Sequence, residues 1–288
     1  MTYGKAILGD NQFLGVNHAN QAKAAELYER FKYPEAILEV IGAAYEAGVR
    51  DFMFTTHDRY EPVFDEIRRS NMFPGMYYTP CLPYAHKYWN QLSDKGPFSL
   101  LASTVLQVSL LRSVPAALGL LIGKTGGITQ MLTEIEVLMC KGLPLRGVFL
   151  QNLAFDLIMS MELYDVLDSF SNAVTRRLGT QPGFITMNHP KAVEVLCDRI
   201  GLDHPWLCAN YNFAGFRMNP SQAQCEASFG SRRTKNIAMS VFSSGGAHPS
   251  EALEYVVSRL HGKGIDAILF GSSSSKNIQI NVNRIHGY

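Results

Sequence analysis

Histidines are the residues of this sequence whose type and spacing most directly suggest chemistry. Eight are present, and four of them come after short apolar runs of the kind that form buried strands: His18, His57, His86 and His189. Histidine transfers protons near neutral pH and is the commonest metal ligand. No HxH or HExxH spacing occurs and few carboxylates accompany these histidines. Proton transfer is therefore favoured, and no metal site is predicted.

Two loops rich in glycine and serine form a second chemical feature. Ser243-Ser244-Gly245-Gly246 follows one apolar run, and Gly271-Ser272-Ser273-Ser274-Ser275 follows the next. Backbone N–H groups in such loops, with the N-terminus of the following helix, bind phosphate groups. Ordinary turns with good helix caps use the same residues. Because both loops carry the pattern, recognition of a phosphorylated substrate or a dinucleotide cofactor is favoured.

The elements that must position these residues alternate along the whole chain. Strands are predicted at 12–16, 51–55, 76–79, 147–151, 183–187, 206–210, 237–241 and 267–270. Amphipathic helical patterns lie between them, at 34–47, 157–178, 191–200, 250–260 and 277–285. Eight strands alternating with helices predict an α/β fold, the (β/α)8 TIM barrel, as a single domain over 1–288. An open doubly wound sheet is the alternative, but no GxGxxG follows the first strand.

In such a barrel the active site lies at the carboxyl ends of the strands. The polar residues expected there are His57 and Asp58 after the second strand, Lys87 after the third and Gln151 after the fourth. One connection, 81–146, is far longer than the others and predicts a helical insertion that acts as a lid or an interface. Its apolar stretch, 98–122, is interrupted by polar and proline residues, so we expect no membrane span but a candidate homo-oligomer contact.

Composition narrows the class of protein further. The chain has 288 residues with a formal net charge of +1, which argues against a nucleic-acid partner and favours a small-molecule substrate. Five widely spaced cysteines without a CxxC pair predict reduced thiols. The first residues lack the pattern of a signal peptide. Together these features predict a cytoplasmic protein.

The order of several segments resembles the aldo-keto reductase superfamily. The segments concerned are Ala47-Gly48-Val49-Arg50-Asp51-Phe52 followed by Tyr60, Gly183-Phe184-Ile185-Thr186-Met187-Asn188-His189, Asn210-Tyr211-Asn212, Ala238-Met239-Ser240-Val241-Phe242, and Gly271 to Ser275 continuing through Ile278 and Asn281. The resemblance covers nearly the whole chain outside the long connection.

This resemblance implies an NADP-dependent enzyme with Tyr60 as the acid. It also implies a set of cofactor-binding residues: Asn188, Asn212, Gly271, Ser272, Ser273, Ser274 and Asn281. Ser243, in the first of the two loops rich in glycine and serine, is expected to bind the cofactor as well. The sequence departs from the family pattern at other catalytic positions, where Thr55 replaces the aspartate, Pro80 the lysine, and Gln151 or Asn152 the histidine. We expect His86 or Lys87 to supply the missing positive charge.

Three functions remain open. The first is a divergent aldo-keto-reductase-like oxidoreductase that acts on a small carbonyl compound with NADP, using Tyr60 with His57, His86 or Lys87. The second is a non-redox lyase, aldolase or isomerase on a small or phosphorylated substrate, in which His57 and His189 perform acid–base work. The third is a barrel that serves as a non-catalytic scaffold.

Overall fold

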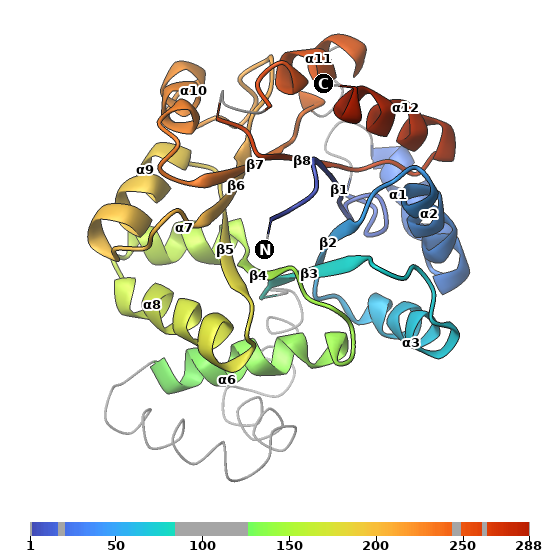
Figure 1. The fold of residues 1–288 in the computed structure, drawn as a ribbon, viewed down its shortest axis with the longest axis horizontal. Helices are drawn as coiled ribbons and strands as arrows, with labels where there is room; N and C mark the ends of the chain where they lie inside the picture. The colour runs from blue at the N-terminus through green and yellow to red at the C-terminus, as the bar shows by residue number, and fades with distance from the viewer. Residues whose placement is uncertain (1, 17–20, 84–125, 244–248, 261–263, 288) are drawn as a thin grey trace.

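Eight parallel strands form a closed barrel in chain order, with helices around it (Figure 1). The computed structural model describes residues 2–16, 21–83, 126–243, 249–260 and 264–287. The strands are β1 (Ala6–Leu8), β2 (Asp51–Thr55), β3 (Tyr77–Leu82), β4 (Gly147–Leu150), β5 (Gln181–Thr186), β6 (Trp206–Asn210), β7 (Lys235–Met239) and β8 (Ala267–Phe270). The pairing of β1 with β8 closes the circle, which confirms the predicted TIM barrel.

The helices follow the strands as expected for this fold. They are α1 (Gln21–Arg30), α2 (Pro34–Glu46), α3 (Glu61–Ser70), α6 (Gly126–Val137), α7 (Asn152–Ser160), α8 (Tyr164–Asn172), α9 (His189–Val193), α10 (Gln222–Gly230), α11 (Pro249–Val257) and α12 (Ser275–His286). Short helical turns η1 (Asp58–Tyr60), η2 (Leu138–Cys140), η3 (Ala173–Arg177) and η4 (Glu194–Arg199) extend or connect them.

The first strand lies earlier in the chain than predicted. The sequence pattern placed it at 12–16, but β1 is Ala6–Leu8. Residues 10–13 instead form a turn in which the Phe13 N–H donates to the Asp10 carbonyl at 2.8 Å. Phe13 is fully buried because it packs in a loop against the aromatic rings of Phe31 and Phe52. A buried residue in a loop can therefore produce the same apolar sequence pattern as a residue in a strand.

A small apolar cluster fills the interior of the barrel. Its buried members are Tyr3, Ile7, Met53, Cys81, Phe149, Trp206, Cys208, Ile237 and Ala267. The ring of Phe149 lies over Gly183, its partner on β5, so closely that a Cβ at residue 183 would lie 2.2 Å from the ring. Tyr3 occupies the amino-terminal end of the barrel, where its hydroxyl pairs with Thr79 Oγ1 at 2.9 Å.

A larger cluster packs the helices onto the outside of the strands. Aromatic rings dominate this layer around β2, where Phe52, Phe54 and Phe64 contact the ring of Tyr60 at centroid distances of 5.4 to 6.0 Å. These contacts fix η1 directly after β2, at the carboxyl end of the barrel.

The long connection between β3 and β4 is described only in part. α6 and η2 confirm that its second portion is helical. The predicted catalytic residues His86 and Lys87 and the apolar stretch 98–122 lie outside the described residues. Within the described ranges, none of the helices combines the length and the apolarity that crossing a bilayer requires.

Candidate functional site

Polar side chains from three strand ends form a hydrogen-bonded line at the carboxyl end of the barrel. Asp10, two residues after β1, accepts through Oδ2 from the Thr55 N–H at 2.7 Å and from the Tyr60 hydroxyl at 3.1 Å. Gln151, which follows β4, donates through Nε2 to Thr55 Oγ1 at 3.1 Å. Asp10 is buried, whereas Thr55 and Gln151 are half-buried. This line joins β1, β2 and β4, where a TIM barrel places its active site.

Asp10 is the carboxyl group of this line, and its environment favours the protonated form. Burial raises the pKa of Asp10 from 3.8 to about 6, although hydrogen bonds from Thr55 and Tyr60 oppose the shift. A carboxyl group with a pKa near 6 exchanges protons readily close to neutral pH. The arrangement can therefore serve as a general acid or a general base.

Tyr60 is placed differently from the acid that the family resemblance implies. The residue is fully buried in the aromatic layer outside β2, and its hydroxyl points to Asp10. Burial and the Asp10 charge raise the pKa of Tyr60 well above its usual value, while Arg59 opposes the shift. A tyrosine in this environment holds its proton firmly.

Asp10 is absent from the residues predicted from the sequence because the first strand was placed too late in the chain. The misplaced strand ended at residue 16 and directed attention to His18, which lies outside the described residues. The available signal was the run Ala6-Ile7-Leu8 followed by Gly9 and Asp10. An apolar triplet ending in glycine and aspartate is a short strand that leads into a polar turn.

His57 and Asp58 do follow β2, but they form the start of η1. The His57 ring accepts through Nδ1 from the Arg59 N–H at 3.0 Å, as a helix cap does. His57 is half-buried and Asp58 is exposed. Both take part in further interactions. Their predicted catalytic role stays a prediction.

His189 lies in the layer of helices, away from the line at Asp10. Its Nδ1 contacts Ser228 Oγ at 2.8 Å, its Nε2 contacts Asn236 Oδ1 at 2.9 Å, and its ring stacks on Phe229 at 4.0 Å. Burial lowers the pKa of His189 from 6.5 to about 4, so the ring is neutral at physiological pH. These contacts describe a histidine that joins α9, α10 and β7.

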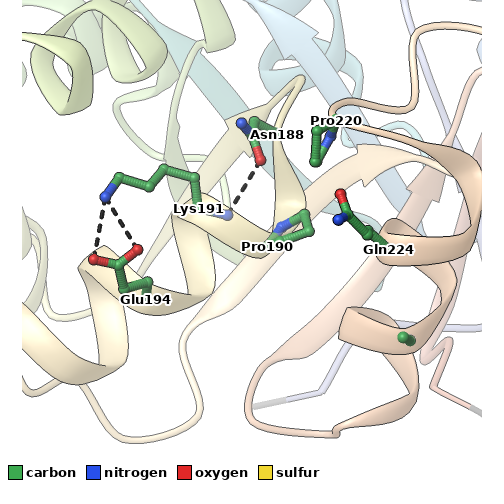
Figure 2. Close-up of a pocket in the computed structure, with 7 residues that line it drawn as sticks. Asn188, Pro190, Lys191, Glu194, Pro220 and Gln224 are labelled. Carbon is green, nitrogen blue, oxygen red and sulfur yellow. Dashed lines mark hydrogen bonds and ion pairs between the residues drawn. The ribbon is translucent and has the colours of Figure 1, made fainter.

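Asn188, predicted to bind the cofactor, caps α9 at the edge of a surface groove. Its side-chain oxygen accepts from the Lys191 N–H at 3.2 Å. The groove, of about 490 Å³, lies between α9 and α10, and the side chains of Pro190, Lys191, Pro220 and Gln224 line it (Figure 2). Lys191 also pairs with Glu194 at 3.0 Å. The residues that line the groove do not include Asp10, Thr55, Tyr60 or Gln151.

Five buried side-chain oxygen atoms have no hydrogen-bond partner among the described residues, and two of them lie near the ends of β7 and β8. These two are Ser243 Oγ, after β7, and Gln12 Oε1, in the turn after β1. The Gln12 oxygen lies against Gly271, where an added Cβ would be only 2.6 Å away. A buried polar atom without a partner costs about 1–3 kcal/mol, and a ligand bound at the carboxyl ends of the strands would supply the partner that these two atoms lack.

The serines after β8 prepare the N-terminus of α12. Ser274 is the cap, with its hydroxyl accepting from the Asn277 N–H, and Ser272 Oγ accepts from the Ser274 N–H at 3.2 Å. The Ser273 carbonyl accepts from Arg30 of α1 at 3.0 Å, which brings a cation to this loop from a distant part of the sequence.

The remaining predicted cofactor residues are Asn281 and Asn212. Asn281 is half-buried on α12. Asn212 is fully buried and bonds in both directions with the backbone of Phe216, so it stabilises the turn after β6. Among the described residues, no group of three or more histidine, cysteine, aspartate or glutamate side chains is arranged to hold a metal ion.

Comparisons with known proteins identify the fold. No protein-family model matches the sequence, and no curated protein matches it significantly. Among solved structures, two from Pseudomonas aeruginosa assigned as aldo-keto reductases are similar, both at 11% identity. One has a TM-score of 0.61 over 99% of this chain and 90% of its own. The other has a TM-score of 0.58 over 98% and 90%.

A third similar structure is that of ligand-free Gox0644, with a TM-score of 0.54 at 12% identity over 89% of this chain and 80% of its own. At these identities the likeness concerns the arrangement of the backbone. It agrees with the order of segments found in the sequence. The chain therefore has the fold of the aldo-keto reductases.

Proposed function

We propose that the chain is an oxidoreductase that reduces a small carbonyl compound with NADPH. The observation that carries this proposal is the pair of buried oxygen atoms, Gln12 Oε1 and Ser243 Oγ, next to the strand ends where a dinucleotide would lie. The similarity of the fold to that of a structure assigned as an aldo-keto reductase supports the same function by analogy. The substrate would occupy the half-buried surface of Thr55 and Gln151 across the barrel mouth.

The residues around α12 suit a dinucleotide. The Ser243 hydroxyl can donate to a phosphate, and Gln12 Oε1 can accept from a ribose hydroxyl or a carboxamide. The first N–H groups of α12 face an anion with the positive end of the helix dipole. When bound, NADPH supplies the hydride. The protein residues then have two tasks, to hold both reactants and to deliver a proton.

The position of Arg30 leads us to expect a preference for NADPH over NADH. Its guanidinium is fixed at the β8–α12 loop by the Ser273 carbonyl and is exposed on the other side. An arginine at this place favours the extra phosphate that distinguishes NADPH from NADH. We therefore assign Arg30 to the selection of NADPH.

Binding measurements test this function directly. Calorimetry of the full chain should detect NADPH, and Arg30→Gln should weaken NADPH binding at least tenfold while NADH binding changes little, since a hydrogen bond to a charged group contributes about 1.5–3 kcal/mol. Arg284→Gln, at the far end of α12, is the matched control and should bind NADPH as the unaltered protein does. If the protein bound neither NADPH nor NADH, the result would contradict the proposed function.

A non-redox proton transfer is the second candidate. The raised pKa of Asp10 supports it, because a carboxylate with a pKa of about 6 is a suitable base for removing a proton next to a carbonyl group. Exchange of the α-protons of a small ketone in deuterium oxide, without any nucleotide, would favour this candidate. The outcome of the nucleotide titration separates the two.

A further inference from the structure

We propose that Asp10 is the residue that exchanges the proton with the substrate at the barrel mouth and that Tyr60 is its positioning residue. The inference rests on the proposed function, because the proton acceptor is the oxygen of the carbonyl compound. It assigns the acid to the end of β1, on a different strand from the tyrosine.

The position of Asp10 supports this assignment. The carboxyl group is 8% exposed and sits over the end of β2, held by the Thr55 N–H at 2.7 Å. Burial, and to a lesser degree the charge of Asp10, raises the pKa of the Cys81 thiol, which belongs to the cluster inside the barrel. Asp10 is therefore close to the barrel interior as well as to the half-buried side chains of Thr55 and Gln151 at the mouth.

The position of Tyr60 makes it unsuitable as the acid. The side chain is fully buried, with Phe54 and Phe64 against its ring. Its hydroxyl donates to Asp10 Oδ2, so a proton leaving Tyr60 would meet the carboxyl group of Asp10 before any substrate. The contact instead fixes the orientation of the carboxyl group.

The charge environment agrees with this division of roles. The described titratable groups that interact with Asp10 are Tyr60 from η1 and Cys81 from β3, and Arg59 acts on Tyr60. Burial raises the pKa of Asp10 to about 6, while the Tyr60 hydroxyl bond lowers it. Removal of that hydroxyl should therefore raise the pKa of Asp10 further.

The carbonyl carbon accepts a hydride from the reduced nicotinamide, the C=O π bond breaks, and the carbonyl oxygen takes the proton from the Asp10 carboxyl group. The nicotinamide is oxidised, the carbonyl compound is reduced to an alcohol, and Asp10 is left as a carboxylate. Water at the mouth of the barrel returns the proton to Asp10.

The test follows the consumption of NADPH with benzaldehyde and a panel of small ketones as probes, over a range of pH. Reduction needs protonated Asp10, so kcat/KM should fall tenfold per pH unit above about pH 6. Asp10→Asn should lower kcat/KM at least a hundredfold and abolish this pH dependence. Tyr60→Phe should stay active, with the fall displaced to higher pH.

Tyr78→Phe is the matched control, because Tyr78 is another buried tyrosine whose hydroxyl has no partner among the described residues. It should leave the pH profile unchanged. Loss of activity in Tyr60→Phe, or an unchanged profile in Asp10→Asn, would overturn the assignment of Asp10 alone. If the unaltered protein consumed no NADPH with any of the probes, the result would instead overturn the proposed function together with this step.

Discussion

Two buried aspartates show how differently single residues are accommodated at the two ends of this barrel. Asp51, at the amino-terminal end, pairs with Arg146 at 2.7 Å. Asp10, at the carboxyl end, accepts from two neutral donors within the described part of the chain, the Thr55 N–H and the Tyr60 hydroxyl. A buried carboxylate with neutral donors alone is incompletely compensated for the loss of water. Asp10 therefore reduces the stability of the fold whenever it is ionised.

Replacement of Asp10 by asparagine should stabilise the protein at neutral pH. The pKa of Asp10 in the folded protein, about 6, lies above its ordinary value of 3.8. The contribution of Asp10 to stability is therefore fully present below pH 3.8 and is lost as the pH rises through 6. An amide stays neutral and still accepts from Thr55. Urea denaturation at pH 7.5 should show a gain of up to about 3 kcal/mol in the free energy of unfolding.

The same variant supplies its own control at low pH. At pH 4 Asp10 is mostly protonated in the folded protein, so the difference in stability between Asp10→Asn and the unaltered chain should nearly vanish. A stabilisation that is the same at both pH values would show that the carboxyl group is not desolvated as described.

At this scale the sequence predicted the location of polar residues better than their environment. Gln151 was predicted for the site and does join the line at the barrel mouth. Tyr60 and His189 were also predicted, yet both are buried in the layer of helices. Whether a side chain turns inward or outward depends on a bend of one or two residues after a strand. No pattern of residue types encodes such a bend.

At the scale of elements, Arg146 joins the amino-terminal ends of neighbouring strands. It precedes β4, bonds Asp51 on β2 and stacks over Tyr77 on β3 at 3.5 Å. The Asp51 carboxylate also accepts from the Gly4 N–H at 2.9 Å, which ties the segment before β1 to β2. One buried ion pair therefore connects four consecutive parts of the barrel.

Arg146→Met should destabilise the protein strongly, because it leaves the carboxylate of Asp51 buried without its partner. The expected loss is about 3–5 kcal/mol in the free energy of unfolding, measured by denaturant titration. Arg69→Met is the matched control on α3, where the ion pair with Glu66 is on the surface and contributes about 0–1 kcal/mol. Equal losses in the two variants would contradict the role given to Arg146.

Element boundaries were predictable where composition changes sharply. β2, β6 and β8 have the predicted ends, because each is an apolar run between polar turns. The segment 157–178 was predicted as one helix, but the structure divides it into α7, α8 and η3. The break comes at Glu162, which has a φ of +56° although neither glycine nor proline marks the place. A turn built from ordinary residues gives no signal in the sequence.

At the scale of the whole molecule, Asp10 and His189 affect acid stability in opposite directions. His189 has a folded pKa of about 4 against 6.5, so its contribution is present above pH 6.5 and is lost as pH falls towards 4. The contribution of Asp10 is lost over nearly the same range as pH rises. Each amounts to about 3 kcal/mol, and the two nearly cancel between pH 4 and 6.

Single variants should reveal the opposing pH dependences of the free energy of unfolding that cancel in the unaltered protein. Between pH 4 and 6, Asp10→Asn should gain stability with rising pH relative to the unaltered protein, and His189→Gln should lose it. The double variant should again resemble the unaltered protein in slope. Free energies of unfolding from urea titrations at several pH values provide the measurement. Parallel curves for all four proteins would contradict the opposing contributions.

The barrel as a whole was the most predictable feature, although one strand was misplaced. The alternation of buried runs with helical patterns persists over the chain, and an error of several residues in one element does not change the count. The candidate site depends on precise strand ends, so the same error removed Asp10 from the residues predicted.

The contact between Phe149 and Gly183 also constrains how this sequence can change. A side chain at 183 would overlap the ring, and loss of the ring leaves a cavity that costs about 3–5 kcal/mol. A side chain at residue 183 alone, or a small residue at position 149 alone, should destabilise the protein. Both changes together should be compatible, because the new side chain can occupy the space that the ring leaves. The order of mutations is therefore restricted: divergent descendants of this gene should exchange both residues through a weakened ancestor, or keep both.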